Sequence, residues 1–478
     1  MQRILAGFTL DDATWLYLSF LLVLAVYFKF SRVWSIRNLD LLLLLGLSPG
    51  VLLLKQPDDS LVLWGNIWLF VGSALALLRA LSDGLIVRRP RLEQNMNAAG
   101  MNFLCAATMV FLTTKLFTEP LQQETVDVLA PSVALGTSSL HRVWPDSRET
   151  LPAIEDPTLL PGPLAGDSAP ESSLSPTPPA PPTPGPTTAL VKRAVGEISR
   201  RMAADSPSSS RLGEVETWVI RGLAILSHLA VLVGLSQIGR RIYADADVGF
   251  AMGALYMLLP CTAYDLGMVQ QVLPAALVVG AIALYRSPIA SGCLLGLASG
   301  MVFFPAFLLP LWAGFYGRKG GWRFAGAVIV TTVLVVATLA LVSQSANELI
   351  ENTLGYVHWT RLSIWEEPDR QSVWGLLGEA WRLPVLVSFL ILLAVLSVWP
   401  RGKSLAELIP QTAAIVLGAQ LWYPQRGGVD VLGSLPLLLL VVFRPTLTGH
   451  GPAEPSPLRW LWSKNAPAAS ATTSEPRA

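Results

Sequence analysis

The chain has 478 residues, of which 52% are hydrophobic and only 14% are charged, against roughly 25% charged residues in an ordinary soluble domain. This composition excludes a soluble globular protein, and a net charge of +1 gives no electrostatic footprint for nucleic acid as a partner. The three cysteines form no CxxC or Cys/His cluster, which argues against a disulfide framework and a zinc site. We therefore expect no metal and no cofactor.

Apolar runs that can cross a bilayer as helices recur along the chain. The first run is followed by Lys29 and Arg32 rather than by a small-residue cleavage site, so we expect an anchor that is not removed. The runs fall into two groups, the first at 14–30, 40–54, 61–80 and 97–115, and the second at 217–237, 248–263, 268–285, 288–316, 322–343, 383–399, 405–422 and 429–444.

Four regions follow from this pattern. Residues 1–116 form a four-span membrane module, 117–212 a hydrophilic insert, 213–446 a second membrane domain and 447–478 a tail. The centre of the insert reads SLSPTPPAPPTPGPTT, which has too few apolar residues to pack and too much proline. We expect the insert to be extracytoplasmic, extended and disordered, and the tail to be disordered and cytoplasmic.

The orientation follows from lysines and arginines in the short loops, which stay on the cytoplasmic side. This rule places the N-terminus outside, the C-terminus in the cytoplasm and the protein in the inner membrane of a bacterial cell. The loop with Lys55, Asp58 and Asp59 then lies outside. The loop cations that decide the orientation are Lys29, Arg32, Arg37, Arg79, Arg88, Arg89, Arg91, Arg240 and Arg241.

The run 288–316 breaks the alternation of the loops. Arg286 before it and Arg318 after it both favour the cytoplasmic side, and Pro305 and Pro310 interrupt it. We therefore predict a pair of short helices that enters the membrane and returns on the inner side. The predicted fold is an all-α integral membrane protein with about eleven transmembrane helices plus this broken helical hairpin.

Tryptophans mark the long outer loop 344–382. They are interspersed with charged residues, and tryptophan favours the headgroup region of a bilayer. We expect interfacial helices that lie flat on the outer leaflet. The tryptophans concerned are Trp359, Trp365, Trp374 and Trp381.

Asp265 is the first candidate for chemistry. It lies in a very short outer turn, within PCTAYDLGMVQQVLP, and Gln270 and Gln271 follow it by about one helical turn. A carboxylate there can act as a general base at the membrane surface. Alternatively, Asp265 is the N-cap of the next helix.

Arg221 and His228 are seven residues apart in one apolar run, which places them on one helix face. Ionisable residues within spans usually face a cavity or a polar ligand. The alternative is an arginine that extends to the outer headgroups and an unrelated core histidine.

Two outer segments carry further polar candidates. One is YVHWTRLSIWEEPDRQSVWG, and in the other Arg426 and Asp430 lie between the last two spans. Arginine suits phosphate because its planar fork makes paired hydrogen bonds. The alternatives are a solvated amphipathic helix and a structural Arg426–Asp430 pair. The candidates in the first segment are His358, Arg361, Arg370 and Gln371.

Four stretches within 217–445 resemble a known family. They read GMVQQVLPAALVVGAIAL, SGCLLGLASGMVFFPAFLLPLWAGFYGRKGGWRF, PDRQSVWGLL and WYPQRGGVDVLGSLPLLLLVV. They are similar to the mannosyltransferase-like bacterial branch of the GT-C-type membrane glycosyltransferases, which use polyprenyl-phosphate sugars. In the third stretch Arg370 stands where that branch usually has asparagine.

The resemblance implies a GT-C-like second half that moves a sugar from a polyprenyl-phosphate donor to an acceptor at the extracytoplasmic face. Asp265 would be the base, and Arg221, Arg361, Arg370 and Arg426 would contact phosphate. His228, Gln271, His358 and Gln371 are the remaining candidates for substrate binding.

Two other classes of function stay open. A non-catalytic membrane scaffold would use the proline-rich insert to hold a partner, and it fits a first group of spans without a matching outer-loop carboxylate. A secondary transporter would need ionisable groups near mid-membrane and repeated halves, and neither is visible in the sequence.

Overall fold

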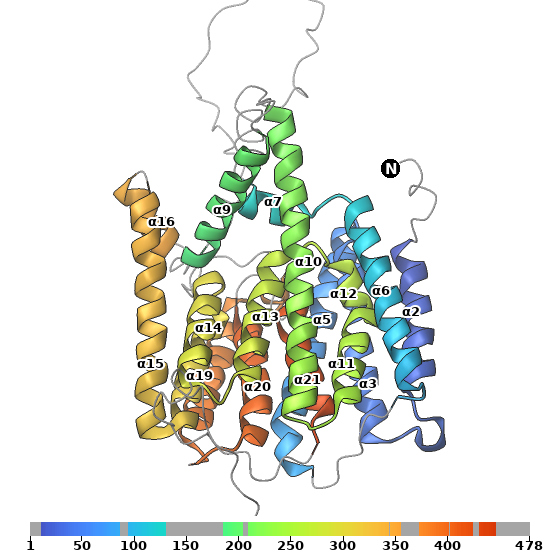
Figure 1. The fold of residues 1–478 in the computed structure, drawn as a ribbon. Helices are drawn as coiled ribbons and strands as arrows, with labels where there is room; N and C mark the ends of the chain where they lie inside the picture. Colours follow the sequence, from blue (N-terminus) through green and yellow to red (C-terminus); the bar gives the residue numbers. More distant parts are fainter. Residues whose placement is uncertain are drawn as a thin grey trace, which may run out of the picture.

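Helices account for all the regular structure in the part of the chain described. The computed structural model describes residues 11–86, 94–130, 185–203, 209–343, 345–354, 372–400, 402–423 and 430–445. Within these ranges there are helices and no strand, and most helices run side by side between two ends of a bundle (Figure 1). The predicted all-α class is confirmed.

The first group of apolar runs forms five helices. A break after Gly46 divides the second run into α3 and α4, and Pro49 occupies the first turn of α4, where a missing N–H costs nothing. The helices are α2 (Asp12–Tyr27), α3 (Ile36–Gly46), α4 (Ser48–Leu54), α5 (Asp59–Ser82) and α6 (Ala98–Thr118).

Two helices lie within 117–212, where the sequence predicts a disordered insert. They are α7 (Gln123–Leu129) and α9 (Pro186–Met202), so both flanks of this insert are helical and the prediction is wrong for them. Helix α9 is held by a tertiary contact of a side chain, because Thr188 Oγ1 donates to the carbonyl of Met301 at 3.3 Å. Residues 173–184, which make up most of the proline-rich centre, lie outside the described residues.

The second group begins with α10, the long helix in the middle of Figure 1. Short 3-10 segments, among them η3 (Asp83–Leu85) and η4 (Phe304–Phe307), join some of the helices. The helices are α10 (Ser209–Arg241), α11 (Ala246–Leu258), α12 (Pro260–Tyr264), α13 (Val269–Ala283), α14 (Pro288–Met301), α15 (Leu308–Val342), α16 (Ala346–Leu354), α18 (Val373–Leu377), α19 (Arg382–Val398), α20 (Leu405–Trp422) and α21 (Val431–Phe443).

The predicted pair of short helices in 288–316 is present. It consists of α14 and the first part of α15, which ends at Gly317, where a φ of +65° interrupts the helix. Tyr316 Oη donates to the carbonyl of Tyr285 at 2.7 Å, so the end of the pair lies beside its beginning. Entry and return on the inner side of a membrane stays a prediction.

Five helical segments of the described chain are long and apolar enough to cross a membrane, which shows its multi-pass character. Six other apolar helices have 10–17 residues. The figure of eleven spans therefore stays a prediction. The five segments are Ile36–Leu54, Asp59–Leu85, Ala98–Thr118, Arg211–Arg241 and Gly320–Val342.

The two groups of helices share one core. Tyr27 Oη of α2 donates to the carbonyl of Ala251 in α11 at 2.8 Å, and its ring packs edge-on against Phe443 of α21. Helix α5 also lies along α20. The first group therefore helps to build any site at the ends of the bundle.

Trp374 differs from its predicted interfacial position. Its side chain is buried, its indole N–H donates to the carbonyl of Tyr423 at 3.2 Å, and its ring packs edge-on against Phe70 of α5. Trp381 is 63% exposed. Trp359 and Trp365 lie outside the described residues.

Candidate functional site

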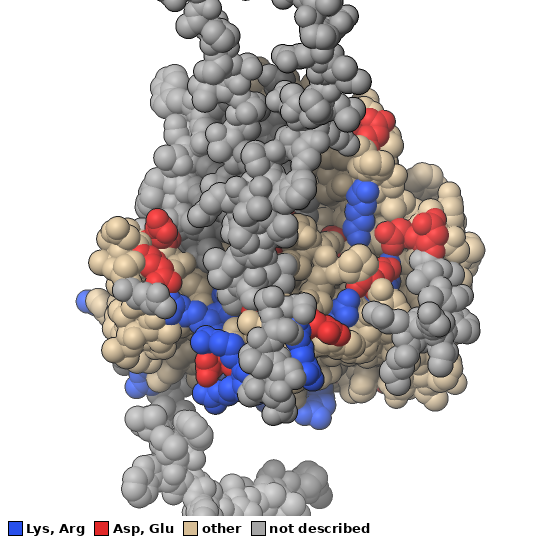
Figure 2. Space-filling view, turned by 90° about the horizontal axis from the view of Figure 1, so that it is seen from above, with Lys and Arg blue, Asp and Glu red and all other residues tan. Residues whose placement is uncertain are grey.

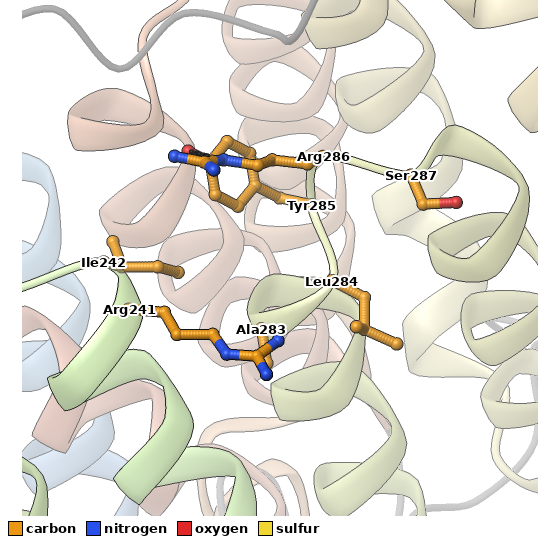
Figure 3. Close-up of a pocket in the computed structure, with 7 residues that line it drawn as sticks. All are labelled: Arg241, Ile242, Ala283, Leu284, Tyr285, Arg286 and Ser287. Atoms are coloured by element: carbon orange, nitrogen blue, oxygen red, sulfur yellow. Dashed lines mark hydrogen bonds between the residues drawn. The ribbon is translucent and has the colours of Figure 1, made fainter. Parts of the chain in front are cut away.

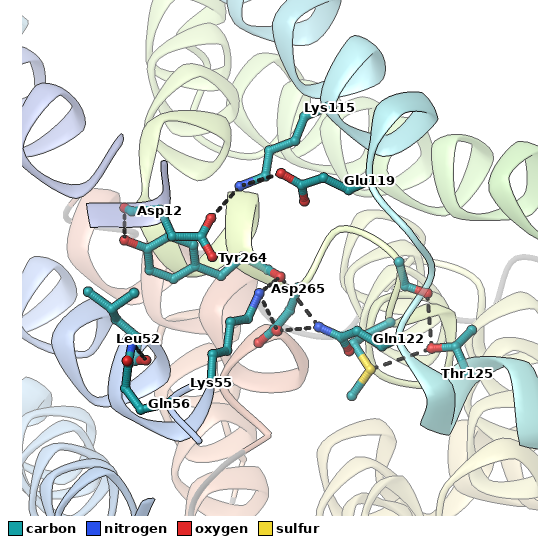
Figure 4. Close-up of polar contacts among 12 residues, drawn as sticks. Asp12, Leu52, Lys55, Gln56, Lys115, Glu119, Gln122, Thr125, Tyr264 and Asp265 are labelled. Atoms are coloured by element: carbon teal, nitrogen blue, oxygen red, sulfur yellow. Dashed lines mark hydrogen bonds and ion pairs between the residues drawn. The ribbon is translucent and has the colours of Figure 1, made fainter. Parts of the chain in front are cut away.

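Polar side chains from both groups of helices meet at the upper end of the bundle in Figure 1. We call them the Asp265 cluster (Figure 4). They come from the start of α2, the ends of α4, α6 and α12, and the residue before α7. Its members are Asp12, Lys55, Lys115, Glu119, Gln122, Tyr264 and Asp265.

The short helix α12 positions Asp265. It spans Pro260–Tyr264, and its C-cap is Asp265, whose φ and ψ of −117° and 31° leave the helical region. The turn is closed by the Met268 N–H, which donates to the Asp265 carbonyl at 3.0 Å. The N-cap of α13 is Met268, with no side-chain cap, so the alternative of Asp265 as an N-cap is wrong.

The carboxylate of Asp265 interacts with the first group. Its Oδ1 accepts from Gln122 Nε2 at 2.8 Å and lies 3.9 Å from Lys55 Nζ. The side chain keeps 16% of its surface exposed. Among its contacts with the described residues, this largely enclosed carboxylate therefore has an amide donor and a cation.

Two ammonium groups lie close to the ring of Tyr264. Lys55 Nζ and Lys115 Nζ lie 5.3 and 5.6 Å from the centroid of its ring, within the range of a cation–π interaction. Lys55 also donates to the Tyr264 carbonyl, and Tyr264 Oη donates to the carbonyl of Asp12 at 2.8 Å. One aromatic side chain therefore fixes two cations from different helices.

Lys115 pairs with two carboxylates, at 2.7 Å from Asp12 Oδ1 and 3.4 Å from Glu119 Oε1. Burial raises the pKa of Glu119, and the charge of Asp12 adds to this rise, while Lys115 opposes it. A raised pKa brings a carboxylate closer to the range in which it works as a general base. Glu119 is therefore a second candidate base.

Arg221 reaches the edge of this cluster. One of its terminal nitrogens donates to the Glu119 carbonyl at 2.8 Å, and its guanidinium carbon lies 5.5 Å from the ring centroid of Trp218. Its Nε is buried and has no hydrogen-bond partner among the described residues. Arg221 thus supplies a third cation at the same end of the bundle.

His228 lies in the core instead. It is 6% exposed, and its two ring nitrogens lie 3.0 Å from Tyr256 Oη and 3.1 Å from the carbonyl of Leu266. The structure therefore favours the core-histidine alternative over substrate binding. Gln271 has a buried Oε1 without a hydrogen-bond partner in the described part of the chain.

The other predicted site residues belong to the segments 355–371 and 424–429. His358, Arg361, Arg370, Gln371 and Arg426 lie outside the described residues, so their roles stay predictions. Asp430 is described, and its carbonyl accepts from Gln420 Nε2 at 3.2 Å.

Sequence reasoning missed most of the cluster. Lys115 was the clearest signal, because it lies at the end of an apolar run that the predicted orientation places outside, where lysine is disfavoured. Lys55 was another, as a lysine in a loop assigned to the outside. Acidic and basic side chains lie intermixed on the visible parts of this face (Figure 2).

No group of three or more His, Cys, Asp or Glu side chains in the described residues could hold a metal ion. Comparison of the chain with protein-family models, curated proteins and solved structures finds no match. Its function must therefore be argued from the Asp265 cluster.

Proposed function

We propose that the protein is a GT-C-type membrane glycosyltransferase that moves a sugar from a polyprenyl-phosphate donor to an acceptor at the extracytoplasmic face. One observation carries the proposal: a partly exposed carboxylate, Asp265, lies at the same end of the bundle as three cations, Lys55, Lys115 and Arg221. Sugar transfer from a lipid phosphate needs this combination of a base and phosphate contacts.

The proposed step is a single inverting displacement. Asp265 takes the proton of the acceptor hydroxyl while that oxygen forms a bond to the anomeric carbon of the sugar. The bond from this carbon to the phosphate oxygen breaks, and the polyprenyl phosphate leaves with the electron pair. Lys55 and Arg221 stabilise the charge that develops on the phosphate.

The residues outside the described part of the chain would complete this site. In the proposal Arg361, Arg370 and Arg426 add phosphate contacts, and His358 and Gln371 contact the sugar or the acceptor. Gln271 is retained as a substrate contact because its buried Oε1 lacks a partner among the described residues.

The charge distribution supports the proposed orientation. Helix α10 carries Arg221 toward the cluster end and ends at Arg240 and Arg241. At that opposite end, Arg286 lies in the connection between α13 and α14, and Arg318 follows the break at Gly317 in α15. Loops rich in arginine stay cytoplasmic. The cluster would then face outward in a bacterial inner membrane, with the N-terminus outside and the C-terminus inside.

Binding of the lipid phosphate is the first test. The full-length protein, purified in detergent, is mixed with polyprenyl phosphate and examined by native mass spectrometry. We expect a bound lipid that Lys55→Gln and Arg221→Gln weaken by about tenfold or more, since each removes a charge-assisted contact. Absence of binding, under conditions in which an established transferase binds, would overturn the proposal.

Transfer is the second test, with a polyprenyl-phosphate mannose as donor and an octyl mannoside as acceptor. Loss of a general base costs about 10²- to 10⁴-fold in rate, which is the loss expected for Asp265→Asn. The matched control is Asp58→Asn, at an exposed N-cap of the same end, because asparagine caps a helix equally well. If Glu119→Gln abolishes transfer and Asp265→Asn does not, the base is Glu119.

A membrane scaffold is the second candidate function, and one observation favours it. The charges of the cluster neutralise one another, Lys115 with Asp12 and Glu119, and Lys55 with Asp265, as in a structural network. A scaffold predicts no binding of polyprenyl phosphate, and it predicts that Asp265→Asn affects stability alone.

A further inference from the structure

A cavity lies at the end of the bundle opposite the Asp265 cluster. It has a volume of about 160 Å³ and is formed by the end of α10 and the connection between α13 and α14 (Figure 3). We propose that this cavity binds the phosphate group of an anionic phospholipid. We call it the Arg241 cavity, and it is lined by Arg241, Ile242, Ala283, Leu284, Tyr285, Arg286 and Ser287.

Two arginines supply the charge for an anion. Arg241 and Arg286 are exposed, and within the described ranges neither has a carboxylate partner. The one hydrogen bond of Arg286 in this part of the chain runs from Nε to Tyr285 Oη at 3.3 Å. Most donors of both guanidinium groups therefore stay available for phosphate oxygens.

Tyr285 gives Arg286 a fixed position. The tyrosine is buried at 4% exposure, and its ring centroid lies 5.8 Å from the guanidinium carbon of Arg286. Stacking on a buried ring reduces the freedom of the arginine side chain before any ligand arrives. Figure 3 shows Arg286 lying along this ring.

The beginning of α14 adds a further attraction for anions. Helix α14 has 14 residues, and its N-cap is Ser287, whose hydroxyl accepts from the Ala290 N–H at 3.3 Å. Pro288 has no N–H and the Ala290 N–H is bound by Ser287, so the attraction at this position comes chiefly from the positive end of the helix dipole. The dipole acts together with the two arginines on the same cavity.

The nearest acidic residue in the chain after Arg241 is engaged elsewhere. Asp245 is the N-cap of α11, and its Oδ1 accepts from the Asp247 and Val248 N–H groups at 3.0 and 3.2 Å. Its carboxylate thus accepts from the backbone at the start of α11, and no ion pair joins it to Arg241 or Arg286 within the described ranges.

Apolar surface beside the arginines favours a lipid over a free anion. Leu284 in the cavity wall is 42% exposed, and Ile289 in the first turn of α14 is 51% exposed. The volume is that of about five water molecules, enough for a phosphate with part of a glycerol. Basic pockets between membrane helices are known to bind anionic lipid headgroups.

The proposal is tested with the full-length protein in detergent and phosphatidylglycerol, with phosphatidylcholine as the uncharged comparison. Native mass spectrometry counts the bound lipid. We expect selective binding of phosphatidylglycerol, which Arg241→Gln/Arg286→Gln weakens at least about tenfold, equal to about 1.4 kcal/mol. The pair Arg241→Lys/Arg286→Lys should bind at an intermediate level, because lysine keeps the charge and loses the paired geometry.

The matched control is Arg318→Gln/Arg323→Gln, which removes two exposed arginines of α15 that do not line the cavity. It should bind phosphatidylglycerol like the wild type. Equal losses in both double variants, or no preference over phosphatidylcholine, would overturn the proposal. Displacement of the lipid by equimolar inorganic phosphate would also overturn it and assign the cavity to free phosphate.

Discussion

Glu119 gives the Asp265 cluster a measurable pH dependence. Burial raises its pKa above the ordinary value of 4.5, so the folded protein holds this proton more tightly than the unfolded chain does. The free energy of unfolding of the wild type should therefore fall, relative to Glu119→Gln, as the pH rises from 4.5 through the raised pKa. The carboxylate is 42% exposed, which keeps the difference below about 1 kcal/mol.

The measurement is the thermal unfolding midpoint in detergent between pH 4.5 and 7.5. The difference in unfolding midpoint between the wild type and Glu119→Gln should be smallest at pH 4.5. It should become constant once Glu119 is ionised. The control Glu124→Gln, at an exposed position of α7, should follow the wild-type profile. If this difference in midpoint narrowed with rising pH, it would contradict the conclusion that burial raises the pKa of Glu119.

A site residue could be predicted from the sequence only when the signal lay within its own segment. Asp265 was predicted as a site residue because a carboxylate in a short turn between apolar runs is unusual whatever the fold is. Its partners Lys55 and Gln122 were not, because they come from other helices and no local pattern records that contact. His228 was placed on the face of Arg221 by helical periodicity, yet its bonds to Tyr256 and Leu266 are core contacts.

At the element scale, Gly317 joins the two parts of α15. Its φ of +65° and ψ of −170° lie in a region that is essentially restricted to glycine. We expect Gly317→Ala to lower the free energy of unfolding by about 1–3 kcal/mol, although a Cβ there would meet no atom within 4 Å. Backbone strain is thus the expected cause.

Gly326 offers the matched control in the same helix. It also has open space around a Cβ, and no positive φ. Gly326→Ala should raise the free energy of unfolding by about 0.4–1 kcal/mol, because alanine restricts the unfolded chain. Chemical denaturation in detergent measures both variants, and equal effects of the same sign would refute the role of the Gly317 conformation.

Helices with signals in the local sequence were more predictable than helices that depend on tertiary contacts. The pair of short helices in 288–316 followed from cations on both sides and prolines within, since both features act locally. The helical flanks of 117–212 did not, because α9 depends on tertiary contacts such as Arg193 with Glu348 at 2.5 Å. The composition of a segment predicts whether that segment can form a hydrophobic core of its own. It does not predict whether the segment packs against a core formed by other helices.

At the scale of the whole molecule, a buried ionic contact joins residues 361 positions apart. Asp83, after α5, is fully buried; it accepts from Arg79 at 3.2 Å and pairs with Arg444, just after α21. Arg79 also donates to Asp40 Oδ2 of α3 at 2.8 Å. The first group of spans is thereby bound to the last helix of the second group, a relation that the sequence left open.

Breaking this contact should destabilise the entire bundle. Asp83→Asn keeps the shape but removes the buried carboxylate that pairs with Arg444, which is 6% exposed, and breaking a buried ion pair costs about 3–5 kcal/mol. In the control Glu197→Gln, the exposed partner of Arg201 at 2.8 Å is neutralised, and the free energy of unfolding should change little, because exposed ion pairs are weak. Because the arginine no longer needs a counter-charge, Asp83→Asn/Arg444→Gln should recover part of the loss. Denaturation in detergent tests this, and equal small effects of Asp83→Asn and Glu197→Gln would mean that the two groups are held together by apolar packing alone.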